Sequence, residues 1–124
     1  MGLLLIEDDI TFANGIALLL KSEGFNVYST GLGEEGIDLG KLYDYDIIVL
    51  DLTLPDMNGF VLSQELVRVR PKLKDRILFM SAVLFGQNTV DHLKAMGAGF
   101  LSKPFETTSL VQVVNRISGL SPAA

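Results

Sequence analysis

Carboxylates, a hydroxyl and an amine follow four short apolar runs of this sequence, and together they could carry out phosphoryl transfer. In chain order they are an acidic pair, a single acid, a hydroxyl and an amine: Glu7-Asp8, Asp51, Ser81 and Lys103. Apolar runs of this length are typical of strands buried on both faces of a parallel sheet. Such sheets bind ligands beyond the carboxyl ends of their strands. These groups are therefore expected at one edge, where phosphoryl transfer needs positioning and charge neutralisation.

Asp51 is the candidate nucleophile of this group. It ends the apolar run Ile47-Ile48-Val49-Leu50, and the segment after it, up to Gly59, contains the proline and the Asn-Gly pair that stop a strand. A carboxylate that attacks a phosphoryl donor forms an acyl phosphate, which is a known route of covalent catalysis. We therefore interpret Asp51 as the acceptor of a phosphoryl group.

The acids at this edge predict a magnesium site. The carboxylates of Glu7, Asp8 and Asp51 would repel one another and raise one another's pKa. A hard cation such as Mg²⁺ relieves that repulsion, since it prefers oxygen ligands and keeps several waters. Lys103 would supply a second positive charge, and Ser81 a hydroxyl donor.

The rest of the chain alternates expected strands and helices. Further strands are expected at 25–29, which has the alternating pattern of an edge strand, at 76–80 and at 99–102. Helices are expected at 11–21, 34–41, 87–96, from the N-cap Asn58 to about Arg70, and around the apolar stripe of 110–117. This alternation predicts an α/β fold, a doubly wound parallel sheet of five strands with helices on both faces. The helix after Asn58 is apolar over more than one face, which favours a crowded core over a docking surface.

Composition limits the classes of function. A chain of 124 residues is expected to form one domain, here residues 1–118, followed by a tail at 119–124. The net charge of −5 argues against nucleic-acid binding, because no basic stripe is present to displace counterions. The absence of cysteine excludes disulfides and thiolate chemistry. Since no signal peptide or apolar run of about 20 residues is present, we expect a cytoplasmic protein without membrane contact.

Four motifs taken together resemble the receiver domain of two-component response regulators, the CheY-like family. They are Leu-Leu-Ile-Glu-Asp-Asp, Val-Leu-Asp-Leu-x-Leu-Pro-Asp-Met-Asn-Gly, Met-Ser-Ala and Phe-Leu-Ser-Lys-Pro-Phe, and the resemblance runs from Leu3 to about Ile117. It implies the flavodoxin-like strand order 2-1-3-4-5 and a phosphoacceptor at Asp51. It also implies that Mg²⁺ is held by Asp8, Asp51 and the backbone carbonyl of Thr53, with Glu7 acting through water.

The resemblance implies further roles at the phosphoryl group. Ser81 and Phe100 are similar to the switch pair of the family, in which the hydroxyl closes on the phosphoryl group and the ring turns inward. Lys103 would pair with the phosphoryl oxygens, and its bond to Pro104 is typically cis in the family. Thr53 and Val83 would flank the path of water and tune the lifetime of the phosphoryl group.

Partners also follow from the resemblance. The expected donor is a phosphohistidine on a histidine kinase or a histidine phosphotransfer protein, and the only reactions expected are phosphoryl acceptance and self-dephosphorylation. The surface at about Gln87–Ser118 would change on phosphorylation and be recognised by a partner or by a second copy in a homodimer. Residues 1–59 are similar to the CtrA type of alphaproteobacterial cell-cycle regulator, which continues into a DNA-binding domain. We do not predict DNA binding by this chain.

Several alternatives stay open from the sequence. The chain could be a diverged relative or a chimera of two receiver halves joined near residue 59, and it could serve as a scaffold that works without phosphorylation. A flavin binder on the same fold is disfavoured, because Glu7-Asp8-Asp9 would repel the flavin phosphate. An aspartate-based phosphatase is disfavoured because the position two residues after Asp51 is Thr53 rather than an acid.

Overall fold

A computed structural model describes residues 1–82 and 86–119 as an alternating series of strands and helices. The strands are β1 (Gly2–Ile6), β2 (Asn26–Thr30), β3 (Ile47–Asp51), β4 (Ile77–Ser81) and β5 (Gly99–Ser102). The helices are α1 (Ile10–Ser22), α2 (Gly33–Leu42), α3 (Gly59–Val69), α4 (Gln87–Ala95) and α5 (Thr107–Ser118), with a 3-10 helix, η1 (Pro71–Asp75), before β4. The predicted alternation of strands and helices is confirmed.

The strands form one parallel sheet in the order β2-β1-β3-β4-β5, as predicted. The apolar strands β1, β3 and β4 occupy the centre, whereas the polar, mostly exposed β2 lies at one edge. In the register, Asp51 lies opposite Met80 and Ser81 lies opposite Ser102. The carboxyl ends of the strands therefore finish at the same edge of the sheet.

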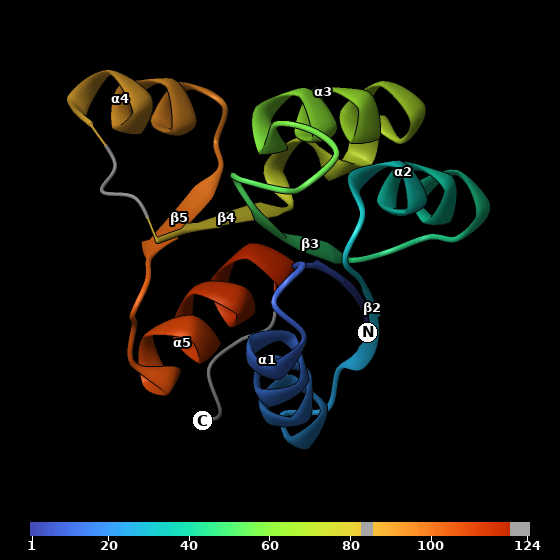
Figure 1. Ribbon diagram of the computed structural model, residues 1–124, viewed down its shortest axis with the longest axis vertical. Coiled ribbons are helices and arrows are strands. Elements are labelled where there is room, and N and C mark those ends of the chain that lie inside the picture. Colours follow the sequence, from blue (N-terminus) through green and yellow to red (C-terminus); the bar gives the residue numbers. More distant parts are fainter. Residues whose placement is uncertain (83–85, 120–124) are drawn as a thin grey trace.

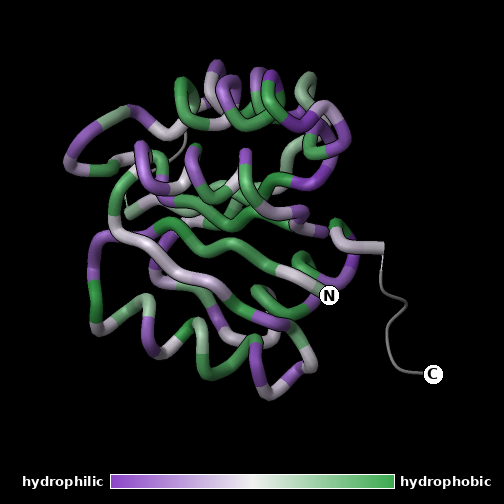
Figure 2. Tube along the Cα trace, turned by 90° about the vertical axis from the view of Figure 1, so that its right-hand side faces the viewer, coloured by the Kyte–Doolittle hydropathy of each residue, from purple (hydrophilic) through white to green (hydrophobic). Residues whose placement is uncertain are grey.

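Helices cover both faces of the sheet (Figure 1). Helices α1 and α5 pack on one face, over a core that contains Leu3, Leu5, Ile16, Leu20, Val49, Leu78, Leu110 and Val114. Helices α2, α3 and α4 lie on the other face, over a core that contains Leu4, Ile6, Ile48, Leu50, Leu62, Leu66, Phe79 and Leu93. The hydropathy colouring shows the apolar strands between these helical layers (Figure 2). Strands apolar on both faces can be buried only in such a three-layer arrangement.

Helix α3 begins and packs as the sequence predicts. The Asn58 side chain accepts a hydrogen bond of 2.7 Å from the backbone N–H of Phe60, which caps the helix. Leu62 and Leu66 are fully buried, whereas Val61 is 52% exposed, so the additional apolar residues mainly serve an ordinary core. Beyond α3 the expectation of a simple end at Pro71 was incomplete, because η1 follows directly and buries Leu73.

Two further expectations concern the ends of the chain and the membrane. Apart from Gly119, the predicted tail at 119–124 lies outside the described residues. No helix within 1–82 and 86–119 has both the length and the apolar character that crossing a bilayer requires.

Candidate functional site

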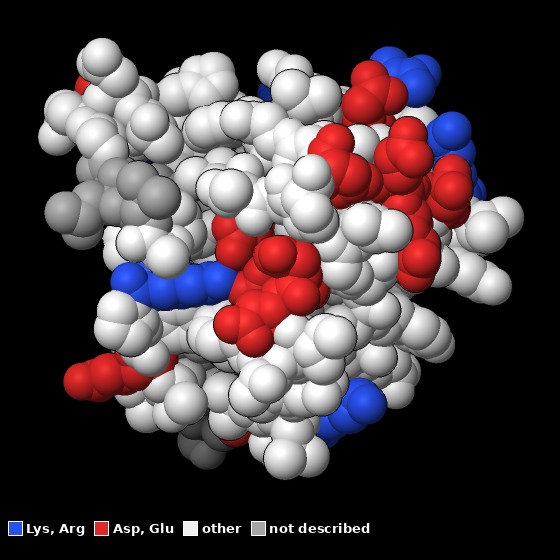
Figure 3. All heavy atoms as spheres, in the orientation of Figure 1, with Lys and Arg blue, Asp and Glu red and all other residues white. Residues whose placement is uncertain are grey.

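The side chains that the sequence places at strand ends come together at one edge of the sheet. The Lys103 ammonium donates hydrogen bonds to Asp51 Oδ2, at 2.7 Å, and to Glu7 Oε1. These residues come from the ends of three different parallel strands, so the convergence is a product of the sheet topology. Acidic side chains gather near the centre of the face shown in Figure 3, with basic atoms beside them.

Asp51 is held in place through both of its carboxylate oxygens. Oδ1 accepts a hydrogen bond of 2.8 Å from the backbone N–H of Thr53, and Oδ2 accepts from Lys103. The residue is only 7% exposed, and the next peptide continues the pairing, since Leu52 N–H donates to Met80 O at 2.9 Å. Asp51 is thus a nearly buried carboxylate with a fixed orientation, which is what a positioned nucleophile requires.

Three carboxylates converge around this position. One oxygen each from Glu7, Asp8 and Asp51 lies within 4.8 Å of the others. Burial raises the pKa of Glu7 to about 7; the hydrogen bond from Lys103 opposes that rise and the charge of Asp51 adds to it. The second Glu7 oxygen, Oε2, is buried and has no hydrogen-bond partner among residues 1–82 and 86–119. Because neighbouring carboxylates disfavour one another's ionised forms, additional positive charge would stabilise this cluster.

Lys103 supplies one positive charge to the cluster. Burial alone would lower its pKa, but hydrogen bonds to Asp51 and Glu7 outweigh that effect and raise the pKa above its ordinary value. The lysine therefore stays charged, and the ammonium lies 4.3 Å from the centroid of the Phe12 ring. The peptide bond from Lys103 to Pro104 is cis, as the resemblance implied.

Ser81 and Phe100 lie on the neighbouring strands. Ser81 ends β4 and is 3% exposed, and its carbonyl accepts a hydrogen bond of 2.7 Å from the backbone N–H of Lys103. Phe100 is half-buried in β5, where it pairs in register with Phe79 and packs against the core under α2, α3 and α4. The structure thus places the predicted switch pair on adjacent strands. Val83, predicted to tune the lifetime of the phosphoryl group, lies outside the described residues.

A comparison with known protein families identifies the kind of domain that contains this site. A family model described as the response regulator receiver domain matches residues 3–115, which include the whole site. The chain belongs to this family. The resemblance on which the sequence analysis relied is therefore confirmed over most of the receiver domain.

Individual relatives agree with this assignment. The cell cycle response regulator CtrA of Brucella ovis is 49% identical over 120 residues, which are 94% of this chain and 50% of that protein. The similarity thus extends beyond residue 59, and the chain spans about half the length of the curated relatives that it matches. The non-phosphorylated HemR receiver domain of Leptospira biflexa is 28% identical with a TM-score of 0.86, covering 99% of this chain and 98% of that one.

Another solved relative bears on the metal. The receiver domain of the sensor histidine kinase PA1611 from Pseudomonas aeruginosa is 25% identical with a TM-score of 0.82, covering 95% of this chain and 97% of that one. That structure is described as having a magnesium ion coordinated in the active site cleft.

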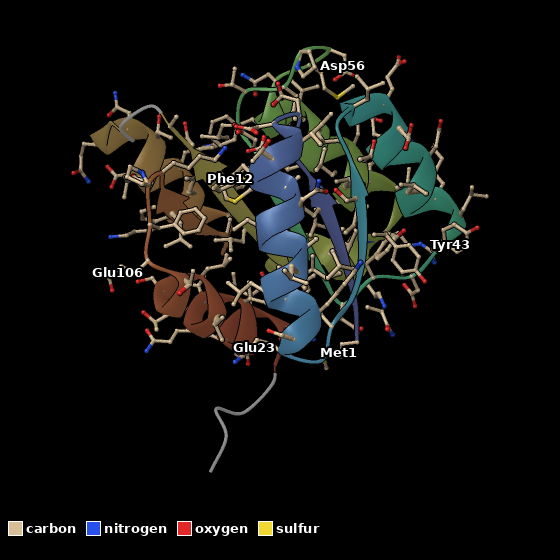
Figure 4. The ribbon with its side chains drawn as sticks, turned by 60° about the horizontal axis from the view of Figure 1, so that its bottom comes forward. Met1, Phe12, Glu23, Tyr43, Asp56 and Glu106 are labelled. Atoms are coloured by element: carbon tan, nitrogen blue, oxygen red, sulfur yellow. The ribbon has the colours of Figure 1, made fainter. Side chains whose placement is uncertain are left out.

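Two acids near the site of this receiver domain have structural roles that the sequence analysis left unassigned. Asp9 accepts a hydrogen bond of 3.0 Å from Phe12 N–H and thereby caps α1. Asp56 caps α2 from another part of the chain, since its carboxylate accepts from Gly33 N–H at 2.8 Å and from Glu34 N–H at 3.0 Å. In Figure 4, Asp56 lies in the loop over the start of α2. The loop that follows the candidate nucleophile is thereby tied to a neighbouring helix.

Replacing Asp56 with alanine should lower the melting temperature of the receiver domain. No other side chain in the described part of the chain caps the first turn of α2, and the two backbone hydrogen bonds lower the pKa of Asp56. A carboxyl group with a lowered pKa stabilises the fold at neutral pH, and this contribution is lost as pH falls through that pKa. Thermal unfolding of both proteins at neutral and at strongly acidic pH measures the effect.

The matched control is Asp38→Ala, which removes an exposed acid from the same helix. We expect its melting temperature to stay close to that of the wild type. Equal melting temperatures for Asp56→Ala and Asp38→Ala would show that the Asp56 cap contributes nothing.

Proposed function

We propose that this receiver domain accepts a phosphoryl group on Asp51 from a phosphohistidine of a histidine kinase or a histidine phosphotransfer protein. The observation that carries the proposal is the contact of one lysine, Lys103, with two buried carboxylates, Asp51 and Glu7, at the carboxyl edge of the sheet. A further acid, Asp8, places an oxygen within 4.8 Å of oxygens of both carboxylates. An ion pair that served only to stabilise the fold would not require this additional negative charge.

The two oxygens of Asp51 suggest how the transfer proceeds. Oδ1 accepts a hydrogen bond from Thr53 N–H, and Oδ2 accepts one from the ammonium of Lys103, which ends a flexible side chain. In the proposed reaction Oδ2 donates an electron pair to phosphorus, the P–N bond breaks, and its electrons remain on the imidazole nitrogen. Lys103 then moves its hydrogen bond from Oδ2 to a phosphoryl oxygen and neutralises the charge there.

In the proposed hydrolysis of the acyl phosphate, the same bond between Asp51 Oδ2 and phosphorus breaks. A water oxygen attacks phosphorus, the bond from Oδ2 to phosphorus breaks, and inorganic phosphate leaves with the carboxylate of Asp51 restored. The proton of the attacking water passes to solvent or to the released phosphate. We propose no other turnover for this domain.

The residues present fit a magnesium ion. Among the described residues, Glu7 Oε2 is buried without a hydrogen-bond partner, and one lysine pairs with the three converging carboxylates. Asp8 and Asp51 would hold the ion with the Thr53 carbonyl, and Glu7 would act through water. When bound, Mg²⁺ would neutralise charge on the phosphoryl oxygens and orient them.

Phosphorylation would be transmitted through β4 and β5. A dianionic group on Asp51 attracts the Ser81 hydroxyl, and Phe100 on the next strand repacks between the sheet and α4. We propose that the surface at Gln87–Ser118 changes as a result and is recognised by a partner or by a second copy of the chain. This switch belongs to the proposed function and depends on the formation of the acyl phosphate.

Incubation with a small phosphodonor such as acetyl phosphate in the presence of Mg²⁺ tests the proposal. The intact mass should increase by one phosphoryl group, and the increase should disappear when the metal is removed by a chelator. Asp51→Asn is the decisive control, since it keeps the shape of the side chain and removes the nucleophile. The proposal fails if the wild type gains no mass or if Asp51→Asn gains as much.

A further inference from the structure

An aromatic ring lies against the lysine of the site and has no role in the function proposed so far. The Lys103 Nζ atom is 4.3 Å from the centroid of the Phe12 ring. That ring packs edge-on against Phe105, with centroids 5.8 Å apart and ring planes at 72°. In Figure 4, Phe12 lies on the flank of α1 that faces the connection from β5 to α5.

The backbone fixes where this ring lies. Phe12 is in the first turn of α1, and its backbone N–H donates to the capping carboxylate of Asp9. Phe105 follows Lys103 by two residues, so it contacts Phe12 from the same segment that carries the lysine. The position of the Phe12 ring relative to Lys103 is thus set from both sides, by a helix cap and by an aromatic contact.

We infer that Phe12 is a positioning residue, whose ring holds the Lys103 ammonium at the carboxylates of Glu7 and Asp51. An ammonium group has three hydrogen-bond donors and no acceptor. Two of these donors serve Glu7 and Asp51, and the ring face lies close enough to take the remaining side by a cation–π contact. The ring then replaces water that would otherwise draw the lysine toward solvent, in agreement with a Lys103 side chain that is only 16% exposed.

The kind of contact matters for phosphoryl transfer, and this consequence rests on the proposed function. A cation–π contact constrains the ammonium to the ring face without fixing the direction of any one hydrogen bond. Lys103 can therefore move a hydrogen bond from Asp51 Oδ2 to a phosphoryl oxygen while it remains against Phe12. A cation already in place when charge develops accelerates the reaction more than one that must be ordered first.

Nuclear magnetic resonance of the unphosphorylated protein tests the position of the lysine directly. The side-chain protons next to the Lys103 ammonium should be shifted upfield by the ring current of Phe12, relative to those of the exposed Lys72. Phe12→Tyr should keep this shift, because it keeps the aromatic face, and Phe12→Leu should lose it. An Lys103 signal that is the same in Phe12→Leu as in the wild type overturns the inference, whether or not the protein can be phosphorylated.

The rate of phosphorylation by acetyl phosphate and Mg²⁺ tests the consequence. We expect Phe12→Leu to slow it about threefold to tenfold, the range of a partly buried cation–π contact, and Phe12→Tyr to restore it. Leu18→Ala, at a 73% exposed position of the same helix, should react at the wild-type rate. An equal loss in Phe12→Tyr and Phe12→Leu would mean that only side-chain packing matters, which also overturns the inference. Absence of phosphorylation in the wild type itself would reject the proposed function and leave the magnetic resonance result as the test of the ring.

Discussion

Replacing Lys103 with methionine is expected to slow phosphorylation of Asp51 by a small phosphodonor on the order of 100-fold or more, the effect of losing one preorganised charge at a reacting centre. Methionine keeps the length and much of the volume of the side chain but removes the ammonium. Because Lys103 is the basic residue that contacts Asp51 in the described structure, no other side chain seen there can take over. The initial rate of mass increase, measured with saturating Mg²⁺, gives the effect.

The same substitution should destabilise the fold in a way that depends on pH. The folded-state pKa of Glu7 is raised from 4.5 to about 7, so Glu7 is protonated below that pH and charged above it. Loss of Lys103 removes the hydrogen bond and the charge that hold this pKa down, so the pKa of Glu7 rises further in the variant. Two unpaired buried carboxylates are then charged only above that raised pKa, and only one is charged below it. We expect Lys103→Met to lose about 3 kcal/mol of unfolding free energy in the alkaline range, and less near about pH 5.5, where Glu7 is protonated in the folded protein.

Urea unfolding without metal at the two pH values measures this difference, and Lys72→Met is the matched control. Lys72 pairs with Asp44 at 2.7 Å, but both side chains are largely exposed, so its loss should change stability by less than about 1 kcal/mol at either pH. A Lys103→Met protein that unfolds like Lys72→Met would show that the ion pairs with Glu7 and Asp51 do not stabilise the fold.

The convergence of the candidate site side chains could be predicted because strand ends in a parallel sheet share one edge. Glu7, Asp51 and Lys103 each follow a recognisable apolar run, so their convergence needs only the strand order. The sequence also indicated the caps of helices by local patterns, as at Asn58. These predictions succeeded because each depends on residues that are neighbours in sequence or on a topology that the pattern implies.

The contacts that were not predicted join distant parts of the chain through side-chain geometry. Asp56 caps a helix 22 and 23 residues before it, and nothing near Gly33 or Glu34 in the sequence indicates that cap. Phe12 looks like an ordinary core residue of an amphipathic helix, and its contact with Lys103 appears only once α1 and the segment after β5 are packed together. The 3-10 helix η1 was missed because five residues are too short for a periodic pattern.

Gly59 is expected to be the position where a single methyl group damages both stability and the site. It begins α3, and its N–H donates to Leu52 O at 2.8 Å, which closes the loop that follows Asp51. A Cβ atom added here would lie 2.6 Å from the backbone oxygen of Asp51 and 2.7 Å from Leu52 Cα. The glycine is required for space, since Gly59 is not one of the residues with positive φ.

Gly59→Ala should therefore destabilise the protein by at least about 2 kcal/mol, as overpacking against atoms that cannot move aside does. Helix propensity alone would predict the opposite, a gain of about 1 kcal/mol. The clash outweighs the gain in helix propensity because the added Cβ would contact backbone atoms. Relief of this clash requires a shift of the Asp51 peptide, which would disturb the hydrogen bond between Asp51 and Thr53. Urea unfolding measures the change, and slower phosphorylation of the folded fraction would report the displaced carboxylate.

Gly15→Ala is the control that separates the two effects. Gly15 lies inside α1 and is exposed, and beyond its chain neighbours and the helix's own backbone no described atom lies within 4 Å of an added Cβ. Only helix propensity acts there, so this substitution should stabilise the protein by up to about 1 kcal/mol. The opposite signs expected for the same chemical change at two helical glycines follow from the close approach of the loop at Gly59. If Gly59→Ala were as stable as Gly15→Ala, the loop after Asp51 would have to be free to move, and the fixed orientation of the Asp51 carboxylate would lose its support.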